Sequence, residues 1–190
     1  MSLDELRAQC LNCKKCGLCE TRNNVVFGIG NPDSKVLFIG EGPGENEDLK
    51  GEPFVGRGGM LLDKMLSVVD LSRDKNIYIA NMVKCRPPKN RDPEENEVAA
   101  CRPWLEEQIR IIDPKIIVCL GRVSAIRFID PNFKVTIEHG QFIEKDGRLV
   151  MGTFHPAAIL RNPNQKPAAM EDFFALQEKI RELCPETYEM

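Results

Sequence analysis

Short apolar segments alternate with segments of helical periodicity along this chain, and this alternation limits the possible fold more than any other feature. Strands that alternate with helices favour a largely parallel sheet with helices on both faces, which is a three-layer α/β/α architecture. Asp146-Gly147, between two apolar stretches, indicates a β-hairpin with a type I′ turn. We predict strands at residues 25–28, 35–40, 76–83, 115–120, 141–145 and 148–154, and helices at residues 59–71, 92–112, 121–129 and 168–183.

The length of the chain, 190 residues, fits one domain that spans residues 1–190. Residues 1–24 form a cysteine-rich arm that we expect to pack onto this domain. The apolar run at residues 116–120 is far shorter than the roughly 18 residues of a membrane-spanning helix, and we expect no membrane contact. The opening MSLDELRAQC has no leader pattern. A net charge of -3 argues weakly against a nucleic-acid partner.

Polar or backbone-permissive residues follow four of the predicted strands. They are Glu41 with the glycines after it, Asn81, Gly121-Arg122 and His155-Pro156. Ligands of open α/β sheets bind beyond the carboxyl ends of the strands. The sequence therefore predicts a binding site where these strand ends meet.

Residues 40–59 contain seven glycines and two prolines, too many for a regular element. A flexible connection is one interpretation and a phosphate-binding loop is another. The segment lacks G-x-x-x-x-G-K-[ST], and its five acidic residues would repel phosphate. A loop whose backbone amides face a neutral, planar ligand fits better.

Eight cysteines in a chain of this size favour metal binding or catalysis over disulfides. Cys10, Cys13, Cys16 and Cys19 recur at every third position, as in ferredoxin-type cluster sites, although Glu20 replaces the usual proline. Zinc held by two cysteines of the arm and two distant ones is the alternative. Cys119 lies in a β-branched run and is interpreted as a core residue, and Cys184 has no assigned role. The two distant candidates are Cys85 and Cys101.

Six segments in the same order carry a family resemblance. The chain closely resembles the type-4 uracil-DNA glycosylases, the iron–sulfur branch of the uracil-DNA glycosylase superfamily, from Cys13 to about Asn162. The segments are C-x-x-C-x-L from Cys13, VVFGIGNPDSKVLFIGEGPGENED from Val25, GEPFVGRGG from Gly51, NMVKCRPPKNRDP from Asn81, AAC from Ala99 and TFHPAAILRN from Thr153.

The resemblance implies a 4Fe-4S cluster held by Cys13, Cys16, Cys85 and Cys101. Cys10 and Cys19 are then spare, and the ferredoxin arrangement becomes the second choice. Such a cluster need not change oxidation state. It could serve to fix the arm to the loop that follows the predicted strand at residues 76–83.

That loop carries Lys84, Arg86, Lys89 and Arg91, four cations that form a candidate phosphate-binding patch despite the acidic total. A solvated surface run is the alternative. Arg161 could contact the DNA backbone beside an extruded nucleotide. Ile159 and Leu160 could fill the gap that the nucleotide leaves, or they could simply pack at a helix start.

The resemblance also assigns the uracil pocket, because a glycosylase must extrude its target base. Phe54 would stack on uracil, unless it is a core residue. Asn81 would form hydrogen bonds with one edge of uracil and reject cytosine, which reverses the donor and acceptor order. An asparagine that only forms a turn is the alternative. His155 would donate to the uracil carbonyl where charge develops. His139 is interpreted as structural.

The residue that activates water is not given by the resemblance. Gly42 stands where the best-known branch has aspartate, and Ala157 stands where the superfamily usually has serine. Glu41 is the first candidate to orient water, or to bind the base through its backbone together with Gly42 and Pro43. Glu47 is the second candidate, and it could also crowd the uracil 5-position to exclude thymine.

The resemblance implies a monofunctional uracil-DNA glycosylase of base excision repair. No lysine is placed as a Schiff-base nucleophile, so strand cleavage is not expected. We expect a monomer that acts on single- or double-stranded DNA in a prokaryotic cytoplasm, at the nucleoid. An iron–sulfur electron carrier and a non-catalytic nucleic-acid module are the alternatives. Neither accounts for the pair of strand-end residues Asn81 and His155.

Overall fold

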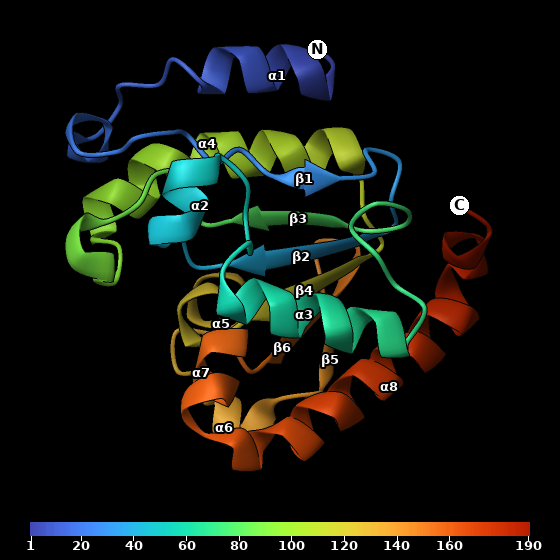
Figure 1. Ribbon diagram of the computed structural model, residues 1–190. Helices are drawn as coiled ribbons and strands as arrows, with labels where there is room; N and C mark the ends of the chain where they lie inside the picture. Colours follow the sequence, from blue (N-terminus) through green and yellow to red (C-terminus); the bar gives the residue numbers. More distant parts are fainter.

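Six strands form one sheet at the centre of the molecule, in the order β1-β3-β2-β4-β6-β5 (Figure 1). In this computed structural model, which describes residues 1–190, the four central strands are parallel and β1 and β5 pair antiparallel at the edges. The strands are β1 (Ile29–Gly30), β2 (Val36–Gly40), β3 (Tyr78–Asn81), β4 (Ile116–Leu120), β5 (Phe142–Lys145) and β6 (Arg148–Thr153).

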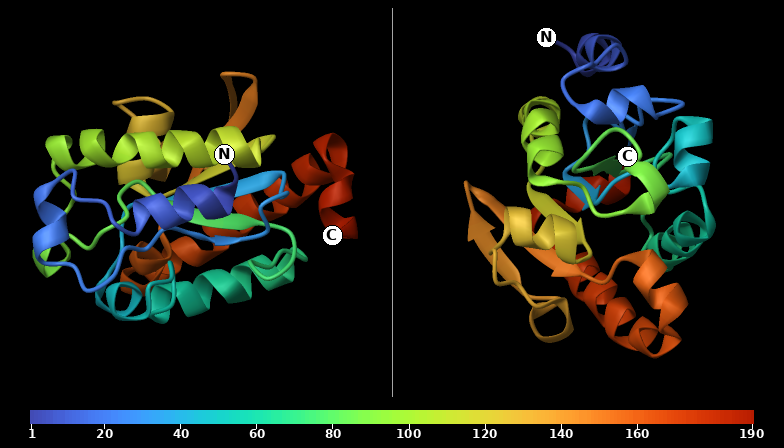
Figure 2. Two further views of the ribbon diagram at one scale, coloured as in Figure 1. Left: turned by 90° about the horizontal axis from the view of Figure 1, so that it is seen from above. Right: turned by 90° about the vertical axis from the view of Figure 1, so that its left-hand side faces the viewer.

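Helices cover both faces of the sheet (Figures 1 and 2). One layer contains α1, α4 and α5, and the other contains α3, α7 and α8. The helices are α1 (Leu3–Cys10), α2 (Glu45–Lys50), α3 (Arg57–Val68), α4 (Glu95–Ile112), α5 (Arg122–Phe128), α6 (Val135–Glu138), α7 (Pro156–Arg161) and α8 (Lys166–Leu183). The predicted three-layer α/β/α architecture is confirmed.

The two-residue period of the strands divides the core into two halves. On β2, Val36 and Phe38 face the layer of α3 and α8, whereas Leu37 and Ile39 face the layer of α4. All four side chains are fully buried, and each contributes about 1.5–3 kcal/mol relative to exposure. Burial on both sides explains why this strand is a continuous apolar run.

The predicted hairpin is confirmed. Lys145 pairs with Arg148 across a two-residue turn. Asp146 has φ 52° and Gly147 has φ 76°, and positive φ at both central positions defines a type I′ turn.

Several predicted boundaries differ from the structure. Residues 25–28 form no strand, and only Ile29–Gly30 joins the sheet. Gly30 approaches the chain of β3 so closely that a Cβ would lie 2.2 Å from the Ile77 carbonyl oxygen. Helix α4 begins at Glu95 and not at Asp92, because Glu94 is the N-cap residue and its N–H donates to the Glu97 carboxylate at 2.8 Å. Four short helices, α1, α2, α6 and α7, were not predicted.

Candidate active site

The carboxyl ends of the four parallel strands meet at one rim, as the strand-end argument predicts. Gly40 at the end of β2 pairs with Asn81 at the end of β3. Leu120 at the end of β4 pairs with Thr153 at the end of β6. The residues that follow these ends, including Glu41 and His155, therefore lie close together.

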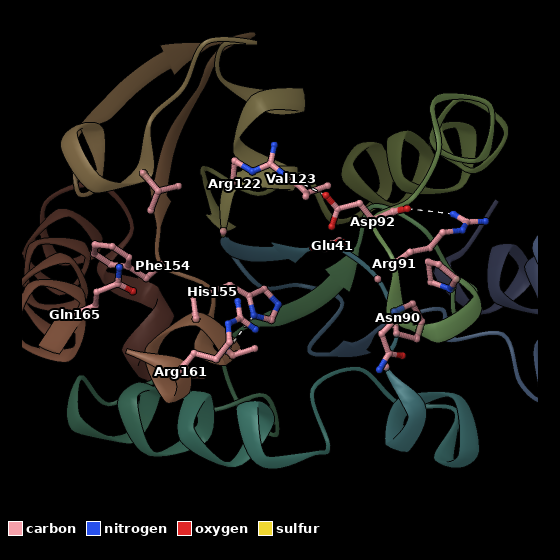
Figure 3. Close-up of a pocket in the computed structure, with 18 of the residues that line it drawn as sticks. Glu41, Asn90, Arg91, Asp92, Arg122, Val123, Phe154, His155, Arg161 and Gln165 are labelled. Atoms are coloured by element: carbon pink, nitrogen blue, oxygen red, sulfur yellow. Dashed lines mark hydrogen bonds and ion pairs between the residues drawn. The ribbon is translucent and has the colours of Figure 1, made fainter. Parts of the chain in front are cut away.

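Two adjoining cavities open at this rim. The smaller, about 290 Å³, is lined by Phe54, Asn81 and His155. The larger, about 760 Å³, is lined by Glu41 and His155 together with residues of the loops around them (Figure 3). His155 lies on the boundary, because it lines both. The smaller cavity is therefore the candidate base pocket, and the larger one is the space beside it.

Asn81 and Phe54 approach each other over Gly40. A Cβ built on Gly40 would lie 2.5 Å from the Asn81 Oδ1 and 2.6 Å from the Phe54 ring, so only glycine fits between them. The Asn81 Oδ1 is buried and has no hydrogen-bond partner. A buried, unpaired acceptor is costly in a protein, and its presence beside an aromatic face indicates a place for a ligand donor.

The position of His155 also fixes which of its nitrogens can donate. Its Nδ1 accepts from the Ala157 N–H at 3.1 Å, so the proton of the neutral ring lies on Nε2. Burial, assisted by the positive charge of Arg161, lowers the pKa of His155 to about 4. The ring is therefore neutral near pH 7, and its centroid lies 5.4 Å from that of Phe54.

Glu41 is the perturbed carboxylate of the larger cavity. Burial, followed by a hydrogen bond and charge repulsion from Asp92, causes a rise in the pKa of Glu41 to about 7. Arg122 and Arg161 oppose it. Arg122 also pairs with Asp92 at 3.1 Å. A carboxylate with a pKa near neutrality can accept a proton at physiological pH.

Glu47 holds the glycine-rich loop together. One carboxylate oxygen accepts the Gly44 N–H at 3.1 Å, and the other accepts the N–H groups of Val55 at 3.1 Å and Gly56 at 2.9 Å. One oxygen thus binds the start of α2, and the other binds the backbone just after Phe54. Gly42 and Pro43 line the larger cavity beside Glu41.

Four cysteine thiols gather where the arm meets the body of the molecule, and the buried Cys10 thiol lies near three of them, those of Cys13, Cys85 and Cys101. Cys85 and Cys101 are buried, and Cys13 and Cys16 pack against the same apolar cluster. Burial raises the pKa of Cys85, and the nearby Cys16 and Cys13 thiols add to the rise. No group of three His, Cys, Asp or Glu side chains is spaced to hold a single metal ion. A four-iron cluster separates its cysteine sulfurs more widely than one ion does.

Three donors point at these sulfurs, and this arrangement fits a thiolate-bound cluster. The Trp104 Nε1–H donates to the Cys13 Sγ at 3.3 Å, and the Arg22 guanidinium donates to the Cys85 Sγ at 3.5 Å. The backbone N–H of Lys84 donates to the Cys101 Sγ at 3.2 Å. Hydrogen bonds to cluster sulfurs are a common feature of iron–sulfur proteins.

Two residues predicted to contact DNA are buried, and those predictions are wrong. Lys84 is 1% exposed, and its ammonium donates to the Asn81 carbonyl oxygen at 3.1 Å and to the Gln108 Oε1 at 2.5 Å. Ile159 is 2% exposed and packs in the core beneath α7. Neither side chain can reach a nucleic acid from these positions.

The other predicted DNA contacts remain accessible. Leu160 is 39% exposed, and Arg161 lines the larger cavity. Lys89 is exposed, whereas Arg86 is half-buried and donates to the Asn90 Oδ1 at 2.8 Å. The Arg91 guanidinium is paired with the Glu97 carboxylate at 2.6 Å, so part of its charge is neutralised.

Some residues of the site were not recognised from sequence. Asp92 was predicted only as the first residue of a helix, but its carboxylate lies beside Glu41 and Arg122. Arg122, in contrast, was named from the sequence, because it follows the end of β4. Lys134, just before α6, and Gln165, just before α8, also line the larger cavity, and no sequence motif marked them.

Comparison with known proteins identifies the class. The profile described as Uracil DNA glycosylase superfamily matches residues 27–176, which include the glycine-rich loop, Asn81 and His155. The chain belongs to this superfamily. It is 47% identical to the type-4 uracil-DNA glycosylase of Sulfurisphaera tokodaii over 96% of this chain and 85% of that protein. It is 42% identical to that of Archaeoglobus fulgidus, over 96% and 94%, and 44% identical to that of Saccharolobus solfataricus, over 94% and 87%.

Within the superfamily, the chain belongs to the type-4 uracil-DNA glycosylases. No helix of the structure is both long and apolar enough to span a membrane.

Proposed function

We propose that this chain hydrolyses the N-glycosidic bond of deoxyuridine in DNA, releases uracil and leaves an abasic site for base excision repair. The observation that carries the proposal is the unpaired, buried Asn81 Oδ1 in a pocket shared with the Phe54 and His155 rings. Family membership supports the same chemistry, because the relatives at 42–47% identity bear the name of this activity.

Recognition of the base depends on Asn81 and Phe54. The Asn81 Oδ1 would accept from the uracil N3–H, and its Nδ2 would donate to the adjacent O4. Cytosine presents an acceptor and a donor at these two positions, so a fixed Asn81 amide opposes it at both. Phe54 would stack on the extruded base, and this stacking would help to offset the cost of unstacking it from DNA.

Bond cleavage would use His155 and Glu41. When the C1′–N1 bond breaks, its electron pair leaves with uracil, and negative charge develops on the base and its O2. The neutral His155 would donate its Nε2–H to that oxygen, which is electrostatic stabilisation by a preoriented donor. Ionised Glu41 would orient the attacking water and accept its proton as the water oxygen bonds to C1′. Glu47 would act indirectly, by holding the loop that carries Phe54.

An iron–sulfur cluster is the cofactor that we propose. Cys13, Cys16, Cys85 and Cys101 would hold a 4Fe-4S cluster, and the three donors aimed at their sulfurs support this choice. When bound, such a cluster would supply a rigid cross-link. It would join the arm to α4 and to the loop after β3, which carries Lys89.

The DNA-binding surface would combine Arg86, Lys89, Arg91, Leu160 and Arg161 around the mouth of the pocket. The exposed Leu160 is the one candidate that could fill the gap left by the extruded base. The chain would act as a monomer on single-stranded or duplex DNA. A repair enzyme of this kind would work in the prokaryotic cytoplasm, at the nucleoid.

An oligonucleotide with one deoxyuridine tests the reaction class. We expect strand breaks only after alkali treatment, because a monofunctional glycosylase leaves an abasic site intact. Breaks without alkali would refute the monofunctional assignment. No alkali-dependent break, on either single-stranded or duplex substrate, would leave the electron carrier or the non-catalytic binding module as the better interpretation.

A further inference from the structure

The backbone of Phe54 adopts an unfavourable conformation. Its φ is +52°, in the left-handed region. Residues other than glycine, asparagine and aspartate rarely adopt this backbone conformation. Residues held in such conformations need a surrounding structure that enforces them, and they cluster at functional sites. The segment that carries the candidate stacking ring must therefore be held in place by other groups.

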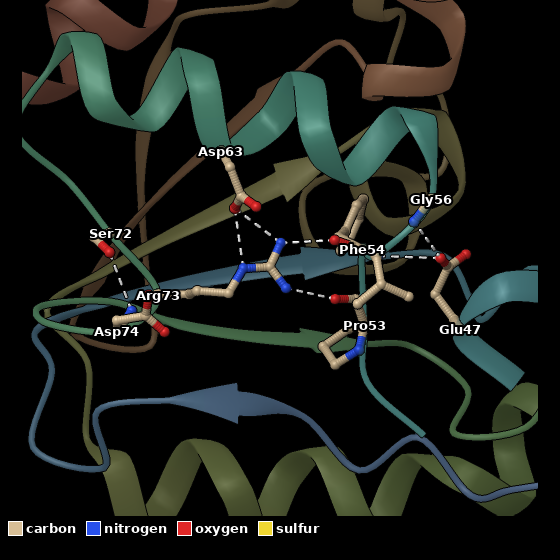
Figure 4. Close-up of polar contacts among 9 residues, drawn as sticks. Glu47, Pro53, Phe54, Gly56, Asp63, Ser72, Arg73 and Asp74 are labelled. Atoms are coloured by element: carbon tan, nitrogen blue, oxygen red, sulfur yellow. Dashed lines mark hydrogen bonds and ion pairs between the residues drawn. The ribbon is translucent and has the colours of Figure 1, made fainter. Parts of the chain in front are cut away.

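Arg73 holds this segment from one side (Figure 4). Its guanidinium donates to the Pro53 carbonyl oxygen at 2.6 Å and to the Phe54 carbonyl oxygen at 2.7 Å. The same group contacts the Asp63 carboxylate at 2.9 Å. Arg73 itself is only 10% exposed, so these bonds are shielded from water, whereas Asp63 is 52% exposed.

The position of Arg73 is fixed by its own loop, which lies between α3 and β3. The Ser72 N–H donates to the Asn76 Oδ1 at 2.9 Å, and the Asn76 Nδ2 donates to the Asp70 carbonyl oxygen at 3.0 Å. The Ser72 Oγ accepts the Asp74 N–H at 3.1 Å. The guanidinium therefore projects from a rigid turn, and its planar fork matches two successive carbonyl groups.

Glu47 and Gly59 hold the segment from its other sides. The Glu47 carboxylate accepts the N–H groups of Val55 and Gly56, the two residues after Phe54. A Cβ on Gly59 would lie 1.8 Å from the Phe54 carbonyl oxygen, so the first turn of α3 packs directly on this peptide. The Arg73 cation thus binds the carbonyls of Pro53 and Phe54, and the Glu47 anion binds the amides of the next two residues.

We infer that Arg73 is a positioning residue for uracil binding: its guanidinium fixes the Pro53 and Phe54 carbonyls, and thereby orients the Phe54 ring toward the base pocket. This inference deepens the proposed function and rests on it for the identity of the stacked base. Arg73 lines neither cavity of the site, so it would act on the base only through Phe54.

The kinetic test compares Arg73→Ala with Arg148→Ala, a matched control remote from the pocket. Arg148 is likewise mostly buried, and like Arg73 it binds two backbone carbonyls, those of Pro114 and Asp146, and one carboxylate, that of Asp113. Stacking stabilises the bound base before and during cleavage, so its loss should appear in KM more than in kcat. We expect Arg73→Ala to raise KM roughly 10- to 100-fold, the order expected for the loss of one base–aromatic stacking contact.

Three further variants separate positioning from stability. Arg73→Lys should recover part of the loss, because one ammonium can reach only one of the two carbonyls. Asp63→Ala should change KM little, because its partner keeps both carbonyl bonds. In a Phe54→Ala background, Arg73→Ala should add no further loss, because the two changes remove the same interaction.

Fluorine NMR of protein grown with 4-fluorophenylalanine reads the ring directly and requires no activity. The chain has nine phenylalanines, and the Phe54 resonance is identified by its absence in Phe54→Leu. We expect this resonance to shift or broaden in Arg73→Ala and to be unchanged in Arg148→Ala.

The outcomes distinguish the inference from the proposed function. An unchanged KM and an unchanged Phe54 resonance in Arg73→Ala would overturn the inference, as would equal effects of Arg148→Ala. If the wild-type chain released no uracil, the proposed function would fail, and the fluorine comparison would still decide whether Arg73 orients the ring.

Discussion

The raised pKa of Glu41 leads to a specific dependence of activity on pH. Burial, assisted by Asp92, raises the pKa of this carboxyl to about 7. If ionised Glu41 accepts the proton of the attacking water, the rate follows its ionised fraction. That fraction rises from about 1% at pH 5 to about half at pH 7, so kcat/KM should increase roughly 50-fold over this interval and level off above about pH 8. His155, whose pKa is about 4, stays neutral throughout and adds no second limb.

Base release under single-turnover conditions, measured from pH 5 to pH 9, tests this dependence. Glu41→Gln should react slowly with a flat profile, because an amide cannot ionise. Asp92→Asn removes the nearest like charge, so the midpoint of the limb should move to lower pH. The exposed Asp33 provides a matched control, and Asp33→Asn should leave the midpoint unchanged.

A rising limb that persists in Glu41→Gln would refute the role of Glu41 as the group that accepts the proton. A flat wild-type profile between pH 5 and pH 8 would refute it equally.

Three further changes test other parts of the account. Asn81→Asp should release cytosine from DNA at a detectable rate, because a protonated carboxyl can present the donor and acceptor order that the amide opposes; a variant that kept wild-type selectivity would contradict the assignment. Cys85→Ala should lose iron and its absorbance near 400 nm, whereas Cys10→Ala, whose thiol is a core group, should keep both; the opposite pattern would favour the ferredoxin arrangement. Gly59→Ala should destabilise the protein by about 1–3 kcal/mol or more in thermal unfolding, because the new Cβ would lie 1.8 Å from a backbone carbonyl. Gly58→Ala, where the nearest atom is at 3.5 Å, is its control and should have a much smaller effect.

The strand ends of the site could be predicted from sequence because they depend on a local pattern. Runs such as residues 35–40 and 115–120 must be buried, and the parallel topology then brings their carboxyl ends together. This argument places Asn81 and His155 at the site from the sequence alone. Their convergence on one pocket follows from the register that pairs Gly40 with Asn81 and Leu120 with Thr153.

The parts that could not be predicted depend on contacts between segments far apart in sequence. Lys84 belongs to a basic run that suggests a surface, but Gln108, on α4, and the Asn81 carbonyl draw its ammonium into the interior. Ile159 precedes an exposed leucine, and only the packing of α7 on α3 separates the two environments. The left-handed backbone of Phe54 depends on Arg73, which lies 19 residues further along the chain.

Direct detection of the released base tests the central claim, that the pocket of Phe54, Asn81 and His155 selects and frees uracil. Three oligonucleotides of the same sequence carry uracil, thymine or cytosine at one position, and mass spectrometry identifies any free base after incubation with the wild-type chain. The account predicts free uracil from the first oligonucleotide and no free base from the other two. Absence of free uracil, or release of thymine or cytosine at a comparable rate, would contradict it.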